Sequence, residues 1–234
     1  MNNNIKTIIE KIKAGEPLTS DEKKKYILYS FCTAHTGKMQ GMQSVSTSCI
    51  ANKYCDARRK VSGTVCEKCY AAAMMKQYNA LSEKLLINTL FYNRYKLEKA
   101  DIPTITVPYF RFEAFGDIQT ELQLQNYYTI ARKNSHVRFA LWTKNDFLLD
   151  LIPVKPRNVI AIYSEPVINK EWTVSQFELF QKYHKNIDKV FIVFDKEYTS
   201  QYGTNINCGA RSCFTCRKCY SKKRDNRIIR ELLK

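Results

Sequence analysis

Eight of the nine cysteines fall into two groups of four, one in each half of the chain. The first cysteine group is Cys49, Cys55, Cys66 and Cys69, and the second cysteine group is Cys208, Cys213, Cys216 and Cys219. Four thiolates complete the coordination of a metal centre, so quartets at short spacing are typical of metal sites. This pattern constrains the fold more than any hydrophobic pattern, because each quartet has to close around one point.

The second cysteine group has the spacing C-x4-C-x2-C-x2-C within the segment CGARSCFTCRKC. Structural zinc sites usually take their ligands as two separated pairs. The overlapping C-x2-C-x2-C run is instead typical of bacterial ferredoxin-type sites, and C-x4-C-x2-C matches the plant-type spacing. The spacing favours an iron–sulfur cluster, and zinc or uncoordinated redox-active thiols are the alternatives.

The first cysteine group has the less specific spacing C-x5-C-x10-C-x2-C, which a zinc knuckle also fits. Both groups end in C-x2-C followed by tyrosine, at Tyr70 and Tyr220, which favours the same cofactor at both. We therefore expect two iron–sulfur clusters of the 4Fe-4S type, with zinc as the alternative cofactor. Cys32, three residues before His35, is interpreted as a small buried residue outside both groups.

The composition is that of a globular protein, with 44% hydrophobic and 26% charged residues. No apolar run approaches the roughly 20 residues of a membrane span, so we expect a cytoplasmic protein without a membrane partner. In that reducing compartment nine cysteines indicate metal binding or redox chemistry, hence a redox partner, rather than disulfides. The net charge of +16 also makes nucleic acid a possible partner.

Strand-like and helix-like segments alternate in the middle of the chain, which predicts βαβ units. The expected strands are Ile105–Phe112, Val137–Trp142, Val159–Tyr163 and Val190–Phe194, with one or two more in the N-terminal half. The expected helices are Asn4–Lys13, Ser20–Tyr29, Ala71–Lys99, Gln119–Lys133, Asn145–Leu151, Thr173–Lys185 and a basic helix over Ser221–Lys234. Ser20 is the expected N-cap of the second of these.

These elements predict an α/β fold with a mostly parallel sheet, a partial β/α barrel with cysteine-rich metal-binding loops at both ends. We expect one domain over 1–234. Within it, 1–70 holds the N-terminal helices and the first cysteine loop, 71–200 the βα core, and 201–234 the second cysteine loop and the C-terminal helix.

Four polar residues follow or end the first two clear strands: Arg111, Glu113, Asp117 and Lys144. Ligands of α/β folds bind outside the carboxyl ends of the strands, so these four are the candidate catalytic residues. The alternative is that Asp117 caps a helix while Arg111 and Glu113 form a solvated pair. The catalytic residues are otherwise unknown from the sequence.

Several segments together resemble a phage and bacterial family named after a mycobacteriophage protein, "gene product eighty-eight". They are TGKMQGMQSVSTSCIANKYC, CEKCYA, FRFEAFGD, FALWTKN and CGARSCFTCRKCY, and they extend from about residue 35 to residue 220. The resemblance implies a phage or prophage protein, located in the cytoplasm of an infected or lysogenic bacterial host. It does not imply a particular reaction.

The expected architecture is also similar to that of radical SAM enzymes, in which an α/β partial barrel lies behind a cysteine loop. The C-x3-C-x2-C loop that leaves one iron open to S-adenosylmethionine is missing, and each quartet here has four thiols. The sequence therefore predicts an iron–sulfur protein of redox or electron-transfer function, and leaves open whether it is an enzyme. The alternatives are a zinc-stabilised nucleic-acid-binding module and a radical SAM-like enzyme in which one cysteine is not a ligand.

Overall fold

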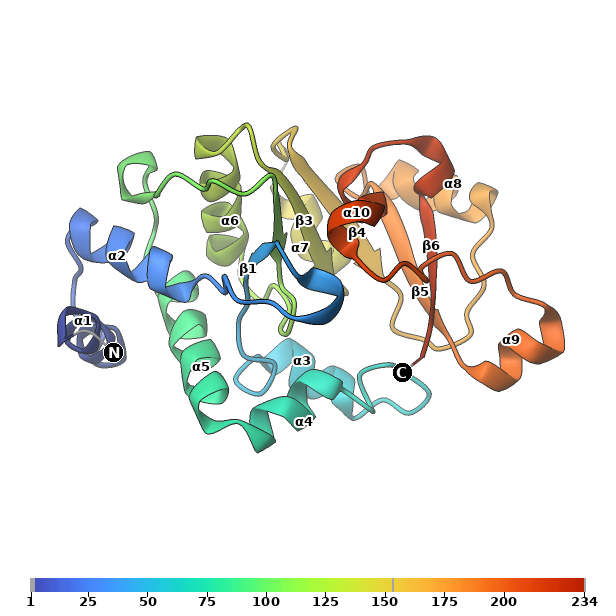
Figure 1. Ribbon diagram of the computed structural model, residues 1–234, viewed down its shortest axis with the longest axis horizontal. Coiled ribbons are helices and arrows are strands. Elements are labelled where there is room, and N and C mark those ends of the chain that lie inside the picture. Colours follow the sequence, from blue (N-terminus) through green and yellow to red (C-terminus); the bar gives the residue numbers. More distant parts are fainter. Residues whose placement is uncertain (1–2, 153, 234) are drawn as a thin grey trace.

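A computed structural model describes residues 3–152 and 154–233, and its centre is one parallel β-sheet (Figure 1). The sheet has six strands in the order β1-β2-β3-β4-β5-β6, and every neighbouring pair is parallel. The strands are β1 (Gln43–Val45), β2 (Tyr109–Phe112), β3 (Arg138–Thr143), β4 (Val159–Ser164), β5 (Lys189–Phe194) and β6 (Ile228–Leu232). Because each strand lies next to its predecessor, the chain winds in one direction, as in a partial β/α barrel.

Helices cover one face of this sheet. Alternate strand residues such as Phe112, Phe139 and Val190 are fully buried there, and Phe112 stacks on Tyr127 of α6 with ring centroids 4.5 Å apart. Burial of each such side chain stabilises the fold by about 1.5–3 kcal/mol. The α-helices of the described residues, on this face and elsewhere, are α1 (Asn3–Ala14), α2 (Ser20–Ser30), α3 (Lys53–Arg59), α4 (Tyr70–Gln77), α5 (Asn79–Arg94), α6 (Glu121–Lys133), α7 (Asp146–Leu151), α8 (Val174–Tyr183), α9 (Lys196–Tyr202) and α10 (Cys213–Cys216).

The second cysteine segment covers the opposite face. Ala140, Ile160 and Ile229 point to that side and form a second apolar cluster with Tyr220. Cys208, Cys213, Phe214 and Cys219 pack against this cluster. Figure 1 accordingly shows α10 lying over the sheet, so the segment that carries the second cysteine group also closes the core.

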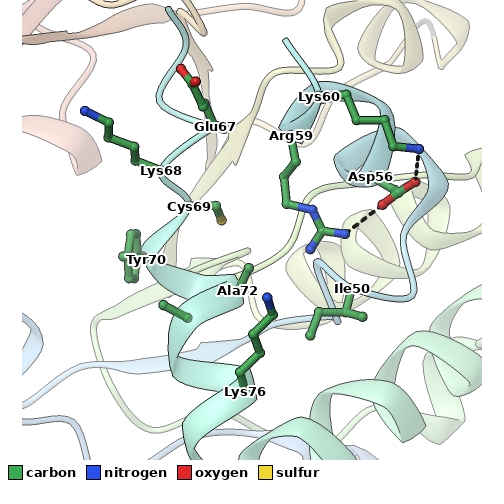
Figure 2. A pocket seen from close by; sticks show the side chains of 11 residues that line it. Ile50, Asp56, Arg59, Lys60, Glu67, Lys68, Cys69, Tyr70, Ala72 and Lys76 are labelled. Atoms are coloured by element: carbon green, nitrogen blue, oxygen red, sulfur yellow. Dashed lines mark hydrogen bonds and ion pairs between the residues drawn. The ribbon is translucent and has the colours of Figure 1, made fainter. Parts of the chain in front are cut away.

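The first cysteine loop runs across the carboxyl ends of the strands. It leaves β1, forms α3, and reaches the end of β4, where Val65 donates a backbone hydrogen bond to the carbonyl of Pro166 at 2.9 Å. It then enters α4, which begins at Tyr70. Between them, α3 and α4 line an open pocket (Figure 2).

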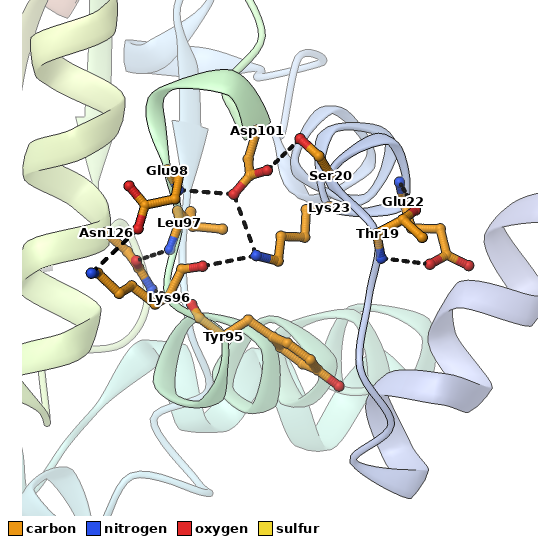
Figure 3. Close-up of polar contacts among 10 residues, drawn as sticks. All are labelled: Thr19, Ser20, Glu22, Lys23, Tyr95, Lys96, Leu97, Glu98, Asp101 and Asn126. Atoms are coloured by element: carbon orange, nitrogen blue, oxygen red, sulfur yellow. Dashed lines mark hydrogen bonds and ion pairs between the residues drawn. The ribbon is translucent and has the colours of Figure 1, made fainter.

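Polar contacts fix the N-terminal helices to the helical layer (Figure 3). Thr19, rather than the expected Ser20, caps α2 and forms a reciprocal capping box with Glu22. Ser20 instead donates to Asp101 at 2.5 Å, and Lys23 forms an ion pair with the same carboxylate at 3.4 Å. Asp101 is almost fully buried, so these partners stabilise a carboxylate that would otherwise destabilise the fold.

The α/β class, the parallel sheet and the four expected strands are confirmed, with β1 as the additional strand in the N-terminal half. The predicted basic helix over Ser221–Lys234 is wrong. Ile228–Leu232 forms β6, which pairs with β5 and buries Ile228 and Ile229 in the sheet. Since β1 and β6 lie outside 71–200, the sheet extends beyond the core segment expected from the sequence. None of the described helices is both long and apolar enough to cross a membrane.

Candidate cysteine sites

All four cysteines of the second group line one small cavity of about 30 Å³. Cys208 is held by its backbone N–H, which donates to the carbonyl of Arg230 in β6 at 2.9 Å. Ser212 caps the short helix that begins at Cys213. Arg217 then adopts a left-handed conformation with φ 57°, which reverses the chain so that Cys219 returns to the same cavity. The overlapping spacing of the sequence is thus folded into a single compact turn.

Two cations face the second cysteine group. Burial raises the pKa of the Cys208 thiol to about 11 and that of Cys219 to about 12. Lys38 acts against this effect at Cys208, and Arg111 acts against it at Cys219. Both cations also oppose the burial that raises the pKa of Cys213. Burial therefore dominates and favours neutral thiols in the absence of a ligand, while the two cations reduce the free-energy cost of forming thiolates.

Arg111 has no carboxylate partner among the described residues. Its guanidinium lies over the ring of Trp142, 4.4 Å from the centroid, and its Nη1 contacts the Met39 sulfur at 3.9 Å. Its Nε atom is buried and makes no hydrogen bond. An unpaired guanidinium of this kind is costly to bury, so an anion next to it would be stabilised.

The first cysteine group contains a hydrogen-bonded thiol pair. The pKa of Cys69 is lowered to about 5 by its hydrogen bond with Cys49, and by backbone N–H groups of Ala71 and Ala72 at the start of α4. The pKa of Cys49 is raised by the same hydrogen bond and by burial. Cys69 is therefore the thiol of this group that ionises most readily, since a helix N-terminus stabilises a thiolate.

Glu113 anchors the loop that precedes Cys49. Its buried carboxylate accepts hydrogen bonds from the backbone N–H of Thr47 at 3.0 Å, the Thr47 hydroxyl at 2.9 Å, Gln123 at 2.7 Å and the Tyr127 hydroxyl at 2.5 Å. Burial raises the pKa of Glu113 to about 7, although these donors oppose the shift. With φ 56° the Glu113 backbone is in the left-handed region, which is strained for a residue with a side chain.

Asp117 anchors the next part of the same loop. Its buried carboxylate accepts hydrogen bonds from the Thr143 hydroxyl and from the backbone N–H of Lys144. Its carbonyl accepts from the Asn52 side chain at 2.8 Å, and the Asn52 oxygen in turn caps α3, which carries Cys55. Burial raises the pKa of the Asp117 carboxyl, while the charge of Lys144 opposes that shift.

Two residues outside the four candidate catalytic residues complete these contacts. A Cβ atom on Gly116 would lie 2.6 Å from both the carbonyl and hydroxyl oxygens of Thr47, so only glycine allows the loop to approach. Tyr54 of α3 donates to the Lys144 carbonyl at 2.6 Å. The FGD sequence that contains Gly116 was the only available signal for either contact.

The four candidate catalytic residues are divided between the two cysteine groups. Glu113, Asp117 and Lys144 lie at the carboxyl ends of β2 and β3, as predicted, and hold the first cysteine loop. Arg111 points to the other face of the sheet, toward the second group. The carboxyl group of Asp117 does not cap a long helix, and Arg111 and Glu113 do not form a solvated pair.

All nine cysteines are free thiols. Within residues 3–152 and 154–233, no group of three or more His, Cys, Asp or Glu side chains has the arrangement needed to hold a metal ion. The four cysteines of the second group thus line one cavity, but their side chains are not arranged as the ligands of a bound metal ion.

Comparison with known proteins gives one family. No curated protein and no solved structure matches the chain. The family model described as Gene product 88 matches residues 8–231, from the first turns of α1 to within β6, and so includes both cysteine groups. The chain belongs to the Gene product 88 family.

Proposed function

We propose that this phage-type protein binds two iron–sulfur clusters, one at each cysteine group, and transfers electrons. The observation that carries the proposal is the convergence of Cys208, Cys213, Cys216 and Cys219 on one cavity. Four thiols from one tight turn are able to reach separate corners of a cuboidal cluster, and ferredoxin-type sites use this spacing.

The charge distribution supports an anionic group at the second site. A 4Fe-4S core held by four thiolates carries a net charge of about −2. Lys38 and the guanidinium of Arg111, which has no carboxylate partner within the described chain, both act on thiols of this group, so they would offset part of that charge. Lys38 is also tied to Glu231 by an ion pair of 2.8 Å, which fixes its position at the edge of the cavity.

The first site has its own stabilising features. Cys69 lies at the N-terminus of α4, and Lys144 favours the thiolate of both Cys69 and Cys66. Arg59 interacts electrostatically with Cys49 and Cys69. These contacts come from residues on α3, α4 and the end of β3, and Asp117 joins the N-cap of α3 to the end of β3.

Electron transfer is favoured over catalysis at iron because each quartet supplies four thiolates. A cluster with four protein ligands has no open iron for substrate or for S-adenosylmethionine. Cluster binding would also draw the thiols of each group closer together than they lie here, since metal binding is coupled to folding. We infer a cytoplasmic location, where thiols are kept reduced and available for such ligation.

Absorption spectroscopy of protein purified without oxygen tests the proposal. Thiolate-to-iron charge transfer should give a brown protein with a band near about 400 nm. Replacement of Cys213 and Cys216 by alanine should remove about half of this band, whereas Cys32→Ala should leave it intact. A colourless protein would contradict the proposal.

Two other results would favour the alternative functions. Steep salt dependence of nucleic-acid binding by a zinc-loaded form would favour a nucleic-acid-binding module. Reductive cleavage of S-adenosylmethionine would favour a radical enzyme.

A further inference from the structure

An open pocket of about 640 Å³ lies between α3 and α4 (Figure 2). Its volume falls in the range of about 300–1,000 Å³ that small-molecule sites occupy. The residues that line it are Ile50, Asp56, Arg59, Lys60, Glu67, Lys68, Cys69, Tyr70, Ala72, Ala73 and Lys76. They come from the first cysteine loop, which includes α3, and from α4, and Asp117 holds the N-cap residue of α3 through its carbonyl.

Cations outnumber carboxylates in this pocket, and both carboxylates already have partners. Asp56 pairs with Arg59 at 2.8 Å and with Lys60 at 2.9 Å. Glu67 accepts hydrogen bonds from the Ser62 hydroxyl at 3.1 Å and the backbone N–H of Gly63 at 2.9 Å. Four cations (Arg59, Lys60, Lys68 and Lys76) therefore face two carboxylates, and the pocket keeps a net positive charge although Asp56 offsets part of the charge of Arg59 and Lys60.

Lys76 is the cation best placed to meet a ligand. It is exposed in the last turn of α4 and makes no hydrogen bond or ion pair with the described residues. Figure 2 shows its amine and the guanidinium of Arg59 extending from opposite helices toward the same space, with Cys69 beside them. Lys68 stands at the rim with its amine directed outward. Two converging cations of this kind suit a phosphate group.

Apolar surface also lines this pocket. Ile50 is 42% exposed and Tyr70 is 61% exposed, so both keep contact area free for a ligand. The Tyr70 hydroxyl donates to the Ala114 carbonyl at 2.7 Å, which fixes the orientation of its ring. An immobilised, exposed aromatic ring is a surface on which a nucleobase stacks.

We infer that this pocket binds a phosphorylated nucleoside, with its phosphate between Arg59 and Lys76. The nucleoside is either a free nucleotide or one nucleotide of a single strand, since both present the same groups. This site adjoins the first proposed cluster, because Cys69 lines the pocket and Arg59 acts on Cys69, but neither Lys76 nor the exposed Tyr70 ring is a ligand of a cluster.

Fluorescence anisotropy with two probes tests the inference: ATP carrying a fluorescent label on its ribose, and a fluorescein-labelled oligothymidylate. Lys76→Glu should weaken binding of the recognised probe at least about tenfold, because a charge-assisted hydrogen bond becomes a like-charge repulsion. The matched control is Lys133→Glu, since Lys133 is also an exposed lysine in the last turn of a helix, α6, and changes the net charge equally. Its affinity should stay within about twofold of the wild type, as expected for a surface charge outside the site.

The two probes separate the sources of the phosphate. Binding of labelled ATP identifies a free nucleotide, and binding of the oligothymidylate alone identifies a strand. Equal losses in Lys76→Glu and Lys133→Glu would show only the general effect of net charge and would overturn the inference, as would failure of both probes to bind the wild type. The absorption band near 400 nm is recorded for each variant, so a failure of cluster binding is recognised separately.

Discussion

Glu113 accepts two hydrogen bonds from Thr47, one from the backbone N–H at 3.0 Å and one from the hydroxyl at 2.9 Å. Thr47 precedes Cys49 by two residues, and Glu113 directly follows β2. This pair therefore joins the first cysteine loop to the carboxyl end of the sheet. It gives Glu113 a positioning role for the first cysteine group, in a place where sequence reasoning expected a catalytic carboxylate.

Glu113→Gln should lower the free energy of unfolding by about 1–3 kcal/mol. In the variant, one carboxylate oxygen is replaced by an NH₂ group, which cannot accept the hydrogen bonds that Thr47 and Gln123 donate to Glu113. At least one buried hydrogen bond would therefore be lost. Urea denaturation at pH 7 measures the difference. Glu16→Gln, in which an exposed carboxylate between α1 and α2 becomes an amide, serves as a surface control and should change stability by less than about 0.5 kcal/mol. Unchanged stability of Glu113→Gln would show that this carboxylate does not brace the loop.

The same variant should remove a pH dependence. Burial raises the pKa of Glu113 to about 7 in the folded protein, above its usual value of 4.5. The folded state then holds this proton more tightly than the unfolded state, so stability due to Glu113 falls as the pH rises from 4.5 to about 7. The slope is at most about 1.4 kcal/mol per pH unit. Asp117, whose pKa is also raised, is present in both proteins and cancels in the difference. Parallel pH profiles of wild type and Glu113→Gln would contradict this account.

Gly116→Ala should destabilise the protein by about 2 kcal/mol or more, because the new methyl group would lie 2.6 Å from two oxygens of Thr47. The loop would have to shift, so the first cysteine group should lose cofactor before the second does. Gly209→Ala is the matched control, since a Cβ there meets no atom within 4 Å. Thermal unfolding and metal content of both variants provide the comparison. Equal behaviour of the two would mean that the close approach at Gly116 is not required.

Arg111→Leu should weaken the cofactor at the second cysteine group and leave the first intact. Loss of the guanidinium removes a charge that opposes the raised pKa of Cys213 and Cys219. It also removes the cation over Trp142, so the tryptophan fluorescence should change. Arg132→Leu is the control, because Arg132 lies over the Tyr128 ring at 5.8 Å and acts on none of these thiols. Similar cofactor loss in both variants would argue against a specific role for Arg111.

The central strands were predictable because β3, β4 and β5 are continuous β-branched and aromatic runs, as strands buried on both faces require. β1 was too short to give a pattern, since it has only the three residues Gln43–Val45. β6 was misread as a helix because Ile228, Ile229, Leu232 and Leu233 recur at helical spacing. In the structure, pairing with β5 makes this segment a strand. That contact joins residues far apart in the sequence, so no local pattern predicts it.

The positions of the candidate site residues were predictable, but their roles were not. Parallel strands bring their carboxyl ends to one edge, which is why Glu113, Asp117 and Lys144 were expected together. Whether a carboxylate at that edge faces solvent or is enclosed depends on which loop folds over it. Here the first cysteine loop encloses Glu113 and Asp117. The loop can approach this closely because Gly116 has no side chain.

Cys32→Ala should leave the cofactor content unchanged. Cys32 belongs to neither cysteine group, and its sulfur contacts His35 Nδ1 at 3.8 Å, while His35 Nε2 contacts the Ser44 hydroxyl at 2.8 Å. Because the other eight cysteines already form two complete quartets, the Cys32→Ala variant should contain as much iron as the wild type. Loss of about half the iron in this variant would show that Cys32 replaces a ligand of one quartet.

Iron, acid-labile sulfide and zinc measured on protein purified without oxygen test the central claim most directly. Two 4Fe-4S clusters predict about eight iron and eight sulfide atoms per chain, without stoichiometric zinc. Cys213→Ala/Cys216→Ala and Cys49→Ala/Cys69→Ala should each retain about half of both, because each variant disables one group. Stoichiometric zinc without sulfide in the wild type, or full iron content in both double variants, would contradict the account.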